Sequence, residues 1–307
     1  MRARADGPGL AGAGAGVGVV AGRVRHVLEP RGVSDEQATV LRQWAPDLQV
    51  LADWSWGLTD TVVLHARTGA REVVVKAAGP GNHHIGREIA AHRQWVAALS
   101  GRGRAPRLLW TDQAANLLVT EHLDGELVLG TRAEGDPSTY AQAGELLAVL
   151  HAQASHIDED YERQQNARTL QWLDGPHRID GATEVELRAH VADFPCQATV
   201  LVPTHGDWQP RNWLRHGDDV RVIDFGRADW RPAHTYFARL AAQQFRGRPD
   251  LEAAFVHGYG EDPREPGAWR RSLLREAVGT ACWAHQVGDV AFEARGHEMV
   301  ADVLRLT

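Results

Sequence analysis

Apolar and polar residues alternate along the first part of the chain. Alternation of this kind predicts strands at 48–52, 61–66 and 73–75, with a turn at 68–71. The connections between these strands are too short for the crossovers that parallel strands need. We therefore expect an antiparallel meander.

A longer hydrophobic period follows. Residues 85–99 have the spacing of a single helix, and two further strands are expected at 107–110 and 117–120. Beyond Gly125 the chain becomes mainly helical, beginning with a helix at 140–154. The pattern predicts an α+β fold with a small N-terminal antiparallel sheet carrying one helix, followed by a larger, mostly helical lobe. A short helix capped by Ser34 is expected to precede the sheet.

The most informative segment is THGDWQPRNWL at 204–214, followed by VIDFG at 222–226. The residues between them predict a hairpin that returns Asp224 close to Asn212. Mg²⁺ prefers oxygen ligands, which both of these side chains supply. Asp207 could orient an attacking hydroxyl group, which phosphoryl transfer requires. The alternative for this segment is a turn-rich loop with a solvated aspartate.

This pattern resembles the aminoglycoside phosphotransferase and choline kinase family. There, His-x-Asp is followed by Asn five positions after the Asp and then by Asp-x-Gly, as at His205, Asp207, Asn212 and Asp224. The resemblance implies a two-lobed protein-kinase-like fold, with Asp207 as catalytic residue and Asn212 and Asp224 as ligands of Mg²⁺. It also implies a nucleotide-binding lobe over 24–122 and a catalytic, substrate-binding lobe over 123–307.

The resemblance extends to the nucleotide. Lys76, after three valines, corresponds to the family lysine that contacts the phosphates of ATP or GTP, and Glu88 corresponds to its glutamate partner. Glu72 and Arg87 are neighbours that complicate this assignment. Further nucleotide contacts are expected from a phosphate loop, a hinge and an apolar wall, at Ser55, Gly57, Glu121, Leu123 and Ile223.

Candidate substrate contacts come from aromatic and acidic residues near the motif. Trp208 and Trp230 could form an aromatic wall, although core packing explains them equally well. Asp229 could contact a substrate amine or lie on the surface. The sequence departs from the family at Tyr236, where a helix aspartate is common.

Composition restricts the other classes of function. The chain of 307 residues is 43% hydrophobic and 24% charged, and its net charge of −7 shows no basic footprint for nucleic acid. A mildly acidic protein is compatible with a cationic substrate. Residues 1–23 are rich in Gly and Ala, which predicts a flexible extension without the apolar run that crosses a membrane.

The sequence therefore predicts a cytoplasmic, ATP-dependent kinase, monomeric or homodimeric, that phosphorylates a hydroxyl group of a small molecule. The favoured acceptor is an aminoglycoside-like or other antibiotic, in resistance or biosynthesis. The alternatives are a housekeeping kinase for an amino sugar, choline or fructosamine, and an inactive kinase-fold binding protein.

Overall fold

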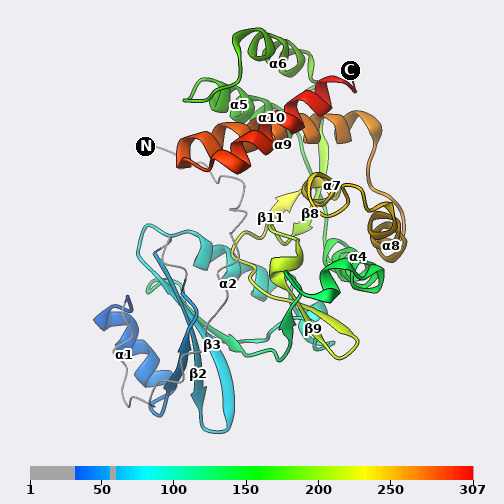
Figure 1. Cartoon of the computed structure of the whole chain (residues 1–307). Coiled ribbons are helices and arrows are strands. Elements are labelled where there is room, and N and C mark those ends of the chain that lie inside the picture. Colours follow the sequence, from blue (N-terminus) through cyan, green and yellow to red (C-terminus); the bar gives the residue numbers. More distant parts are fainter. Residues whose placement is uncertain (1–31, 56–59, 307) are drawn as a thin grey trace.

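The computed structural model describes residues 32–55 and 60–306, and its two parts are shown in Figure 1. The N-terminal part is an antiparallel sheet with strand order β1-β2-β3-β5-β4. Its strands are β1 (Gln49–Asp53), β2 (Thr61–Thr68), β3 (Arg71–Ala78), β4 (Leu108–Asp112) and β5 (Leu117–Glu121). The predicted antiparallel arrangement is confirmed.

Strand β3 shows how the two faces of this sheet differ. Val73, Val75 and Ala77 are fully buried in an apolar cluster that includes residues of α1 (Asp35–Trp44). Because side chains alternate along a strand, Lys76 points to the opposite face. Helix α1 begins at a capping box formed by Ser34 and Gln37, as the sequence predicts.

The prediction of a single helix at 85–99 is wrong, because the structure has two helices there. These are α2 (His84–Gln94) and α3 (Ala97–Ser100), separated at Trp95. The break changes the direction of the apolar side chains. Ile85 and Ile89 pack under the sheet, whereas Trp95, Val96 and Leu99 join the main cluster of the C-terminal lobe. Tertiary packing on two cores therefore overrides the local helical period.

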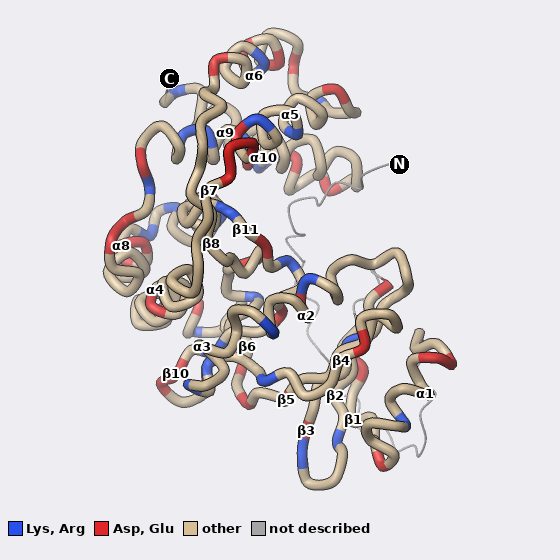
Figure 2. The backbone as a smooth tube through the Cα atoms, turned by 180° about the vertical axis from the view of Figure 1, so that it is seen from behind, with Lys and Arg blue, Asp and Glu red and all other residues tan. Residues whose placement is uncertain are grey.

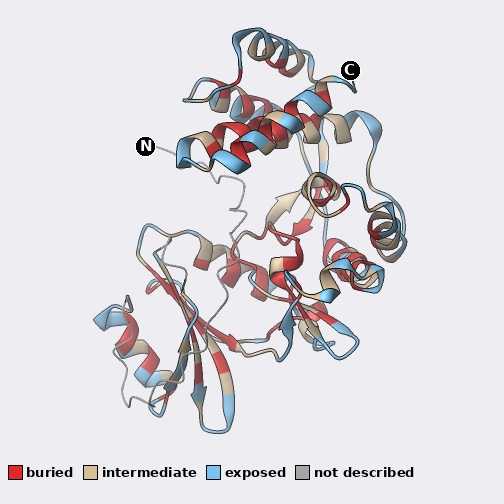
Figure 3. Ribbon diagram, viewed as in Figure 1, coloured by how far each residue is buried: buried red, intermediate tan, exposed pale blue. Residues whose placement is uncertain are grey.

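The C-terminal lobe is mainly helical. Its helices are η1 (Arg132–Gly135), α4 (Pro137–His151), α5 (Tyr161–Leu173), α6 (Gly181–Asp193), η2 (Pro210–Asn212), α7 (Thr235–Ala242), α8 (Pro249–Tyr259), α9 (Pro266–Val287) and α10 (Val290–Leu304). Figure 3 shows buried residues concentrated along the inner faces of α4 and α9. Among the helices within 32–55 and 60–306, none is long and apolar enough to cross a membrane.

Two small sheets hold the motif segments in this lobe. One has the order β10-β9-β6, with β6 (Glu126–Leu127), β9 (Trp213–His216) and β10 (Asp219–Val222). The other has the order β11-β8-β7, with β7 (His156–Asp158), β8 (Thr199–Thr204) and β11 (Asp229–Arg231). Antiparallel pairing of β9 with β10 confirms the predicted hairpin. The segment 205–212 thus leaves one small sheet and enters the other.

Candidate active site

Lys76 makes three hydrogen bonds, one of which joins the two lobes. Its Nζ donates to Oε1 and Oε2 of Glu88, both at 2.8 Å, and to Oδ1 of Asp224 at 2.7 Å. Glu88 lies on the buried face of α2 with Ile85 and Ile89. The structure thus brings together the lysine, glutamate and aspartate that the sequence singled out, and it selects Glu88 over Glu72.

The chemistry of Lys76 is set by these carboxylates. Burial alone would lower the pKa of Lys76, but the charges of Asp224 and Glu88 outweigh burial and raise it. Lys76 is also the single lysine of the whole sequence. An ammonium group has three donors on one atom, which matches the three acceptors here better than a planar guanidinium would.

Asp224 follows β10 at the point where the hairpin returns to Asn212. The Ile223 amide donates to the Asn212 carbonyl at 3.0 Å, which holds the two segments side by side. Asp224 has a φ of 68°, and its side chain is 52% exposed. The nearby positive charge of Lys76 lowers the pKa of Asp224 against the opposing effect of burial, so its carboxylate is ionised.

These two residues suit a divalent cation. Asn212 uses its Nδ2 to donate to the Asp207 carbonyl at 2.8 Å and to Asp207 Oδ2 at 3.0 Å. The amide oxygen of Asn212 is therefore its ligand atom for a metal, beside the ionised and half-exposed carboxylate of Asp224. The donor set is hard oxygen, which fits Mg²⁺.

Asp207 lies between β8 and η2 and accepts hydrogen bonds on both carboxylate oxygens. Oδ1 accepts from Gln209 Nε2 and from Arg239 Nη1, the latter at 3.2 Å. Oδ2 accepts from Arg211 Nη2 at 2.6 Å and from Asn212. These donors fill the roughly four lone-pair positions of a carboxylate. An incoming hydroxyl group must therefore replace one of them.

Three arginines decide the charge of Asp207. Burial would raise the pKa of Asp207, but Arg211, Arg239 and Arg227 together hold it well below its usual range. The carboxylate is therefore ionised at any physiological pH. It is better suited to accept a hydrogen bond from a hydroxyl group than to store its proton.

The loop before Asp207 is fixed by His205 and Gly206. His205 Nδ1 accepts from the Asp207 amide at 3.2 Å, so Nε2 carries the proton and donates to the Ile223 carbonyl at 2.9 Å. Gly206 has a φ of 89°. A Cβ atom at Gly206 would lie 1.8 Å from the Arg227 carbonyl oxygen, which only glycine avoids.

The expected nucleotide contacts that the structure describes come from strand ends of the N-terminal sheet and from the residue before Asp224. Ser55 Oγ accepts from the Val63 amide at 3.0 Å, between β1 and β2, and Gly57 lies outside the described residues. Glu121 ends β5 and Leu123 follows it, both half-buried. Ile223, also half-buried, precedes Asp224.

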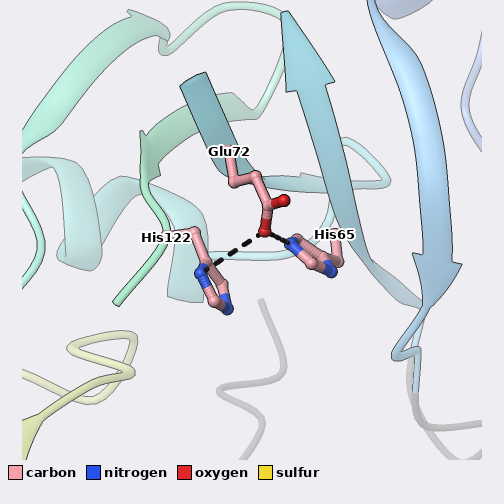
Figure 4. Close-up of side chains that lie close together, drawn as sticks. All are labelled: His65, Glu72 and His122. Atoms are coloured by element: carbon pink, nitrogen blue, oxygen red, sulfur yellow. Dashed lines mark hydrogen bonds and ion pairs between the residues drawn. The ribbon is translucent and has the colours of Figure 1, made fainter. Parts of the chain in front are cut away.

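Close to this hinge, Glu72 lies between two imidazole rings (Figure 4). Its Oε2 is 2.8 Å from His65 Nε2 and 3.9 Å from His122 Nδ1. The His65 ring stacks on Trp54 and on His122, with centroid separations of 4.7 and 4.4 Å. The three ligand atoms lie within 4.8 Å of one another, and hydrogen bonding accounts for the shortest contact without an ion. The stacked rings form an aromatic edge beside the hinge.

The candidate substrate residues have different environments. Trp208 is fully buried and packs edge-on against His205 and Trp213, so it belongs to the core and has no surface for a substrate. Trp230 is half-buried in β11, against the edges of Trp95 and His156. Asp229 lies next to Arg231, with their nearest charged atoms 3.7 Å apart.

A pocket of about 180 Å³ opens beside Asp207. It is bounded by α5, α7 and α9, by β11 and the loop at Gly206, and by one side chain of α2. Six arginines line it: Arg87, Arg168, Arg227, Arg231, Arg239 and Arg275. Sequence patterns gave no signal for this pocket, because its arginines come from six separate segments.

Comparison with known proteins agrees with this geometry. Residues 53–271 match the family described as "Phosphotransferase enzyme family". No curated protein matches the chain.

Solved structures of similar fold include three kinds of phosphotransferase. A thermostable mutant of aminoglycoside phosphotransferase APH(4)-Ia, in complex with ADP and hygromycin B, is 15% identical with a TM-score of 0.65, over 87% of this chain and 97% of that chain. Choline kinase LicA from Streptococcus pneumoniae is 14% identical with a TM-score of 0.62, over 88% and 100%. Macrolide 2'-phosphotransferase MphH from Brachybacterium faecium is 18% identical with a TM-score of 0.53, over 88% and 98%.

These likenesses confirm the two-lobed, protein-kinase-like α+β fold. The family match spans both lobes, from the end of β1 into α9, and includes Lys76, Asp207 and Asp224. The chain belongs to the phosphotransferase enzyme family of small-molecule kinases.

Proposed function

We propose that this protein transfers the γ-phosphoryl group of ATP to a hydroxyl group of a small molecule, with Mg²⁺ as the metal. The observation that carries the proposal is the contact of Lys76 with both Glu88 and Asp224. The β9–β10 hairpin brings Asp224 back beside Asn212, which donates to Asp207. Phosphoryl transfer needs cations at the phosphates and an acceptor for the hydroxyl hydrogen bond, and this site has both.

In the proposed reaction, the acceptor oxygen forms a bond to the γ-phosphorus while the bond to the β-bridging oxygen breaks. ADP leaves and the hydroxyl proton is released. Asp207 orients the hydroxyl by accepting its hydrogen bond, and Lys76, held by Glu88, steadies the α- and β-phosphates. Asn212 and Asp224 would hold Mg²⁺, which neutralises charge on the transferred group. Ser55, Gly57, Glu121, Leu123 and Ile223 stay predicted nucleotide contacts, with GTP as the alternative to ATP.

The acceptor class rests on the family and on the sequence. Relatives include proteins named for aminoglycosides, macrolides and choline. An antibiotic acceptor is the first proposal, and a housekeeping kinase or an inactive binding protein is the alternative. The cytoplasmic location, the monomeric or homodimeric state, the extension at 1–23 and the lobe boundary after His122 stay predictions from the sequence.

The test is release of ADP from Mg-ATP across hydroxyl acceptors of different charge, in wild type and in Asp224→Asn. We expect acceptor-dependent release that stops in EDTA and falls on the order of 100-fold or more in Asp224→Asn. Nucleotide binding is measured in parallel by calorimetry. Release that is unchanged in EDTA and in Asp224→Asn would contradict the proposal, and binding without any release favours the binding-protein alternative.

A further inference from the structure

We propose that the acceptor is an anion, a hydroxyl compound that also carries a phosphate or carboxylate group, held by the arginines of the pocket beside Asp207. This inference rests on the proposed function, since it assigns the acceptor site of the same enzyme. We call the pocket the arginine pocket, defined by Arg87, Arg168, Arg227, Arg231, Arg239 and Arg275.

The arginine pocket adjoins the catalytic loop directly. Gly206, the residue before Asp207, lines it. Arg239 also lines it and donates to Asp207 Oδ1 at 3.2 Å. A molecule in the pocket therefore lies next to the carboxylate that would orient its hydroxyl group.

Helical spacing directs one face of each neighbouring helix to the pocket. On α5 these residues are Tyr161, Gln165, Arg168, Thr169 and Trp172, which recur at every third or fourth position. On α9 they include Arg275 and Glu276. Polar residues of both helices thus line the pocket, with Arg168 exposed to solvent and Gln165, Arg275 and Glu276 half-buried.

The lining has a strong excess of positive charge. Among the described residues that line the pocket, six are arginines and a single one, Glu276, is acidic. Figure 2 shows positively charged positions around β11 and along the facing part of α2. The chain as a whole has a net charge of −7, so this local charge is opposite to the overall composition.

Carboxylates near the pocket are shared between arginines. Glu162 accepts from Arg275 at 2.6 Å and from Arg271 at 3.2 Å. Asp207 is shared by Arg211 and Arg239, and Glu276 accepts from Arg239 at 3.2 Å. Asp229 also lies 3.7 Å from Arg231. The positive charge available to a ligand is therefore the excess of six arginines over the one acidic residue of the lining, Glu276.

Guanidinium groups bind phosphate and carboxylate through paired N–H donors, which gives both charge and direction. An anion at Arg239 would also compete with Asp207 for that arginine. Its binding would free the position that Arg239 occupies on Oδ1, where Gln209 remains as the other donor, and the acceptor hydroxyl could take that position.

The same charge argues against the cationic substrate that the net charge and Asp229 suggested. A polycationic aminoglycoside in this pocket would face six like charges. The pocket is also smaller than the roughly 300–1,000 Å³ of drug-sized sites, so a compact acceptor fits it best. Trp172 and Tyr161 offer flat apolar surface for its uncharged part.

The experiment measures binding of inorganic phosphate to the full chain saturated with Mg-AMP-PNP, by calorimetry. Saturation with the analogue keeps phosphate away from the nucleotide site. We expect phosphate to bind wild type and to bind roughly tenfold more weakly in Gln165→Glu, which places a negative charge in the pocket. Arg168→Gln should weaken binding in the same direction.

Matched controls lie on the same helix. Gln164→Glu adds the same charge at an exposed position of α5, and Arg163→Gln removes an exposed arginine paired with Asp160. Both controls should bind phosphate within about twofold of wild type, as expected of distant surface changes. Equal weakening in Gln164→Glu and Gln165→Glu would overturn the proposal, as would an absence of phosphate binding to wild type.

Other probes distinguish the source of the anion and the fate of the two proposals. Tighter binding of phosphate than of glycolate assigns a phosphate ester, and the reverse order assigns a carboxylate. If kanamycin binds and neither phosphate nor glycolate displaces it, the inference is overturned. If Mg-AMP-PNP binds and phosphate does not, the inference alone fails. If phosphate binds at the pocket and the nucleotide does not, the proposed kinase function fails instead.

Discussion

At the scale of the residue, Lys76 donates three hydrogen bonds from one nitrogen to two carboxylates. The chain has arginine, and not lysine, at all of its remaining Lys or Arg positions, and it has its lysine where three acceptors converge on one nitrogen. A strand-end lysine followed by a helix glutamate was readable from the sequence, because each lies in a local pattern. The contact of Lys76 with Asp224, which is 148 residues away, follows only from the fold.

The uniqueness of Lys76 gives a clean chemical test. An ATP derivative with an acyl-phosphate group acylates amines that lie close to the bound phosphates. We expect labelling at Lys76, found by peptide mapping, because the proposed nucleotide delivers the reagent to its Nζ. Excess Mg-ATP should suppress it, and Lys76→Arg should keep only the label of the amino terminus. Label at the amino terminus alone in wild type would contradict the assignment.

The residues around Asp207 illustrate what sequence could not supply. Asn212 belongs to the recognised motif, and Arg211, four positions after Asp207, lies inside it without a known role. Arg239 lies 32 residues from Asp207 and had no signal at all. Trp208 had two equal explanations, and its complete burial selects core packing. Long-range ion pairs and burial depend on tertiary structure, which a single sequence does not display.

At the scale of the element, the segment between β8 and η2 depends on Gly206. We expect Gly206→Ala to lower the free energy of unfolding by more than about 3 kcal/mol, because its Cβ would overlap the Arg227 carbonyl. The protein that remains folded should have reduced turnover. Chemical denaturation and ADP release measure the two effects.

The matched control is Gly217→Ala in the β9–β10 turn. Gly217 also has a positive φ, 57°, but no atom lies within 4 Å of the added Cβ. Gly217→Ala should lower the free energy of unfolding only by the cost of the left-handed backbone conformation, roughly 1–2 kcal/mol. Turnover should change little. Equal destabilisation by both substitutions would show that the close approach at Gly206 is unimportant.

Elements were predicted best where the pattern is local. The β9–β10 hairpin, the three strands that begin the sheet and the helix after Ser34 are all present near their expected positions. The division of one expected helix at Trp95 was not predicted, because it arises when Trp95 packs against Trp230 of the other lobe, with ring centroids 5.2 Å apart.

At the scale of the whole molecule, buried histidines link stability to pH. Burial lowers the pKa of His92 and of His151 to about 3, and that of His234 to about 4. In the unfolded chain the pKa of each of these histidines is about 6.5. As pH falls below about 6.5, the unfolded chain takes up protons that the folded chain does not, so stability falls.

This effect predicts a slope of about 1.4 kcal/mol per pH unit for each such histidine between about pH 6 and 5. Urea denaturation across this range measures it. His92→Asn should reduce the slope by about one proton. A free energy of unfolding that stays constant from pH 6.5 to 5 would contradict the prediction.

The fold could be predicted from the sequence more completely than the proposed acceptor site. The two-lobed architecture follows from hydrophobic patterns and one extended motif. The proposed acceptor site does not, because its arginines come from α2, α5, α7, β11, α9 and the loop at Arg227, and only the packing of both lobes brings them together.

The proposal that Asp207 orients the acceptor hydroxyl for phosphoryl transfer is tested by comparing wild type with Asp207→Asn. Transfer of the γ-phosphoryl group is measured at equal occupancy by Mg-ATP. The amide keeps the size of the side chain and removes its charge. With a hydroxyl acceptor that supports turnover, we predict a loss on the order of 10²–10⁴-fold in transfer, with nucleotide affinity nearly unchanged. Transfer at the wild-type rate in Asp207→Asn would contradict the account.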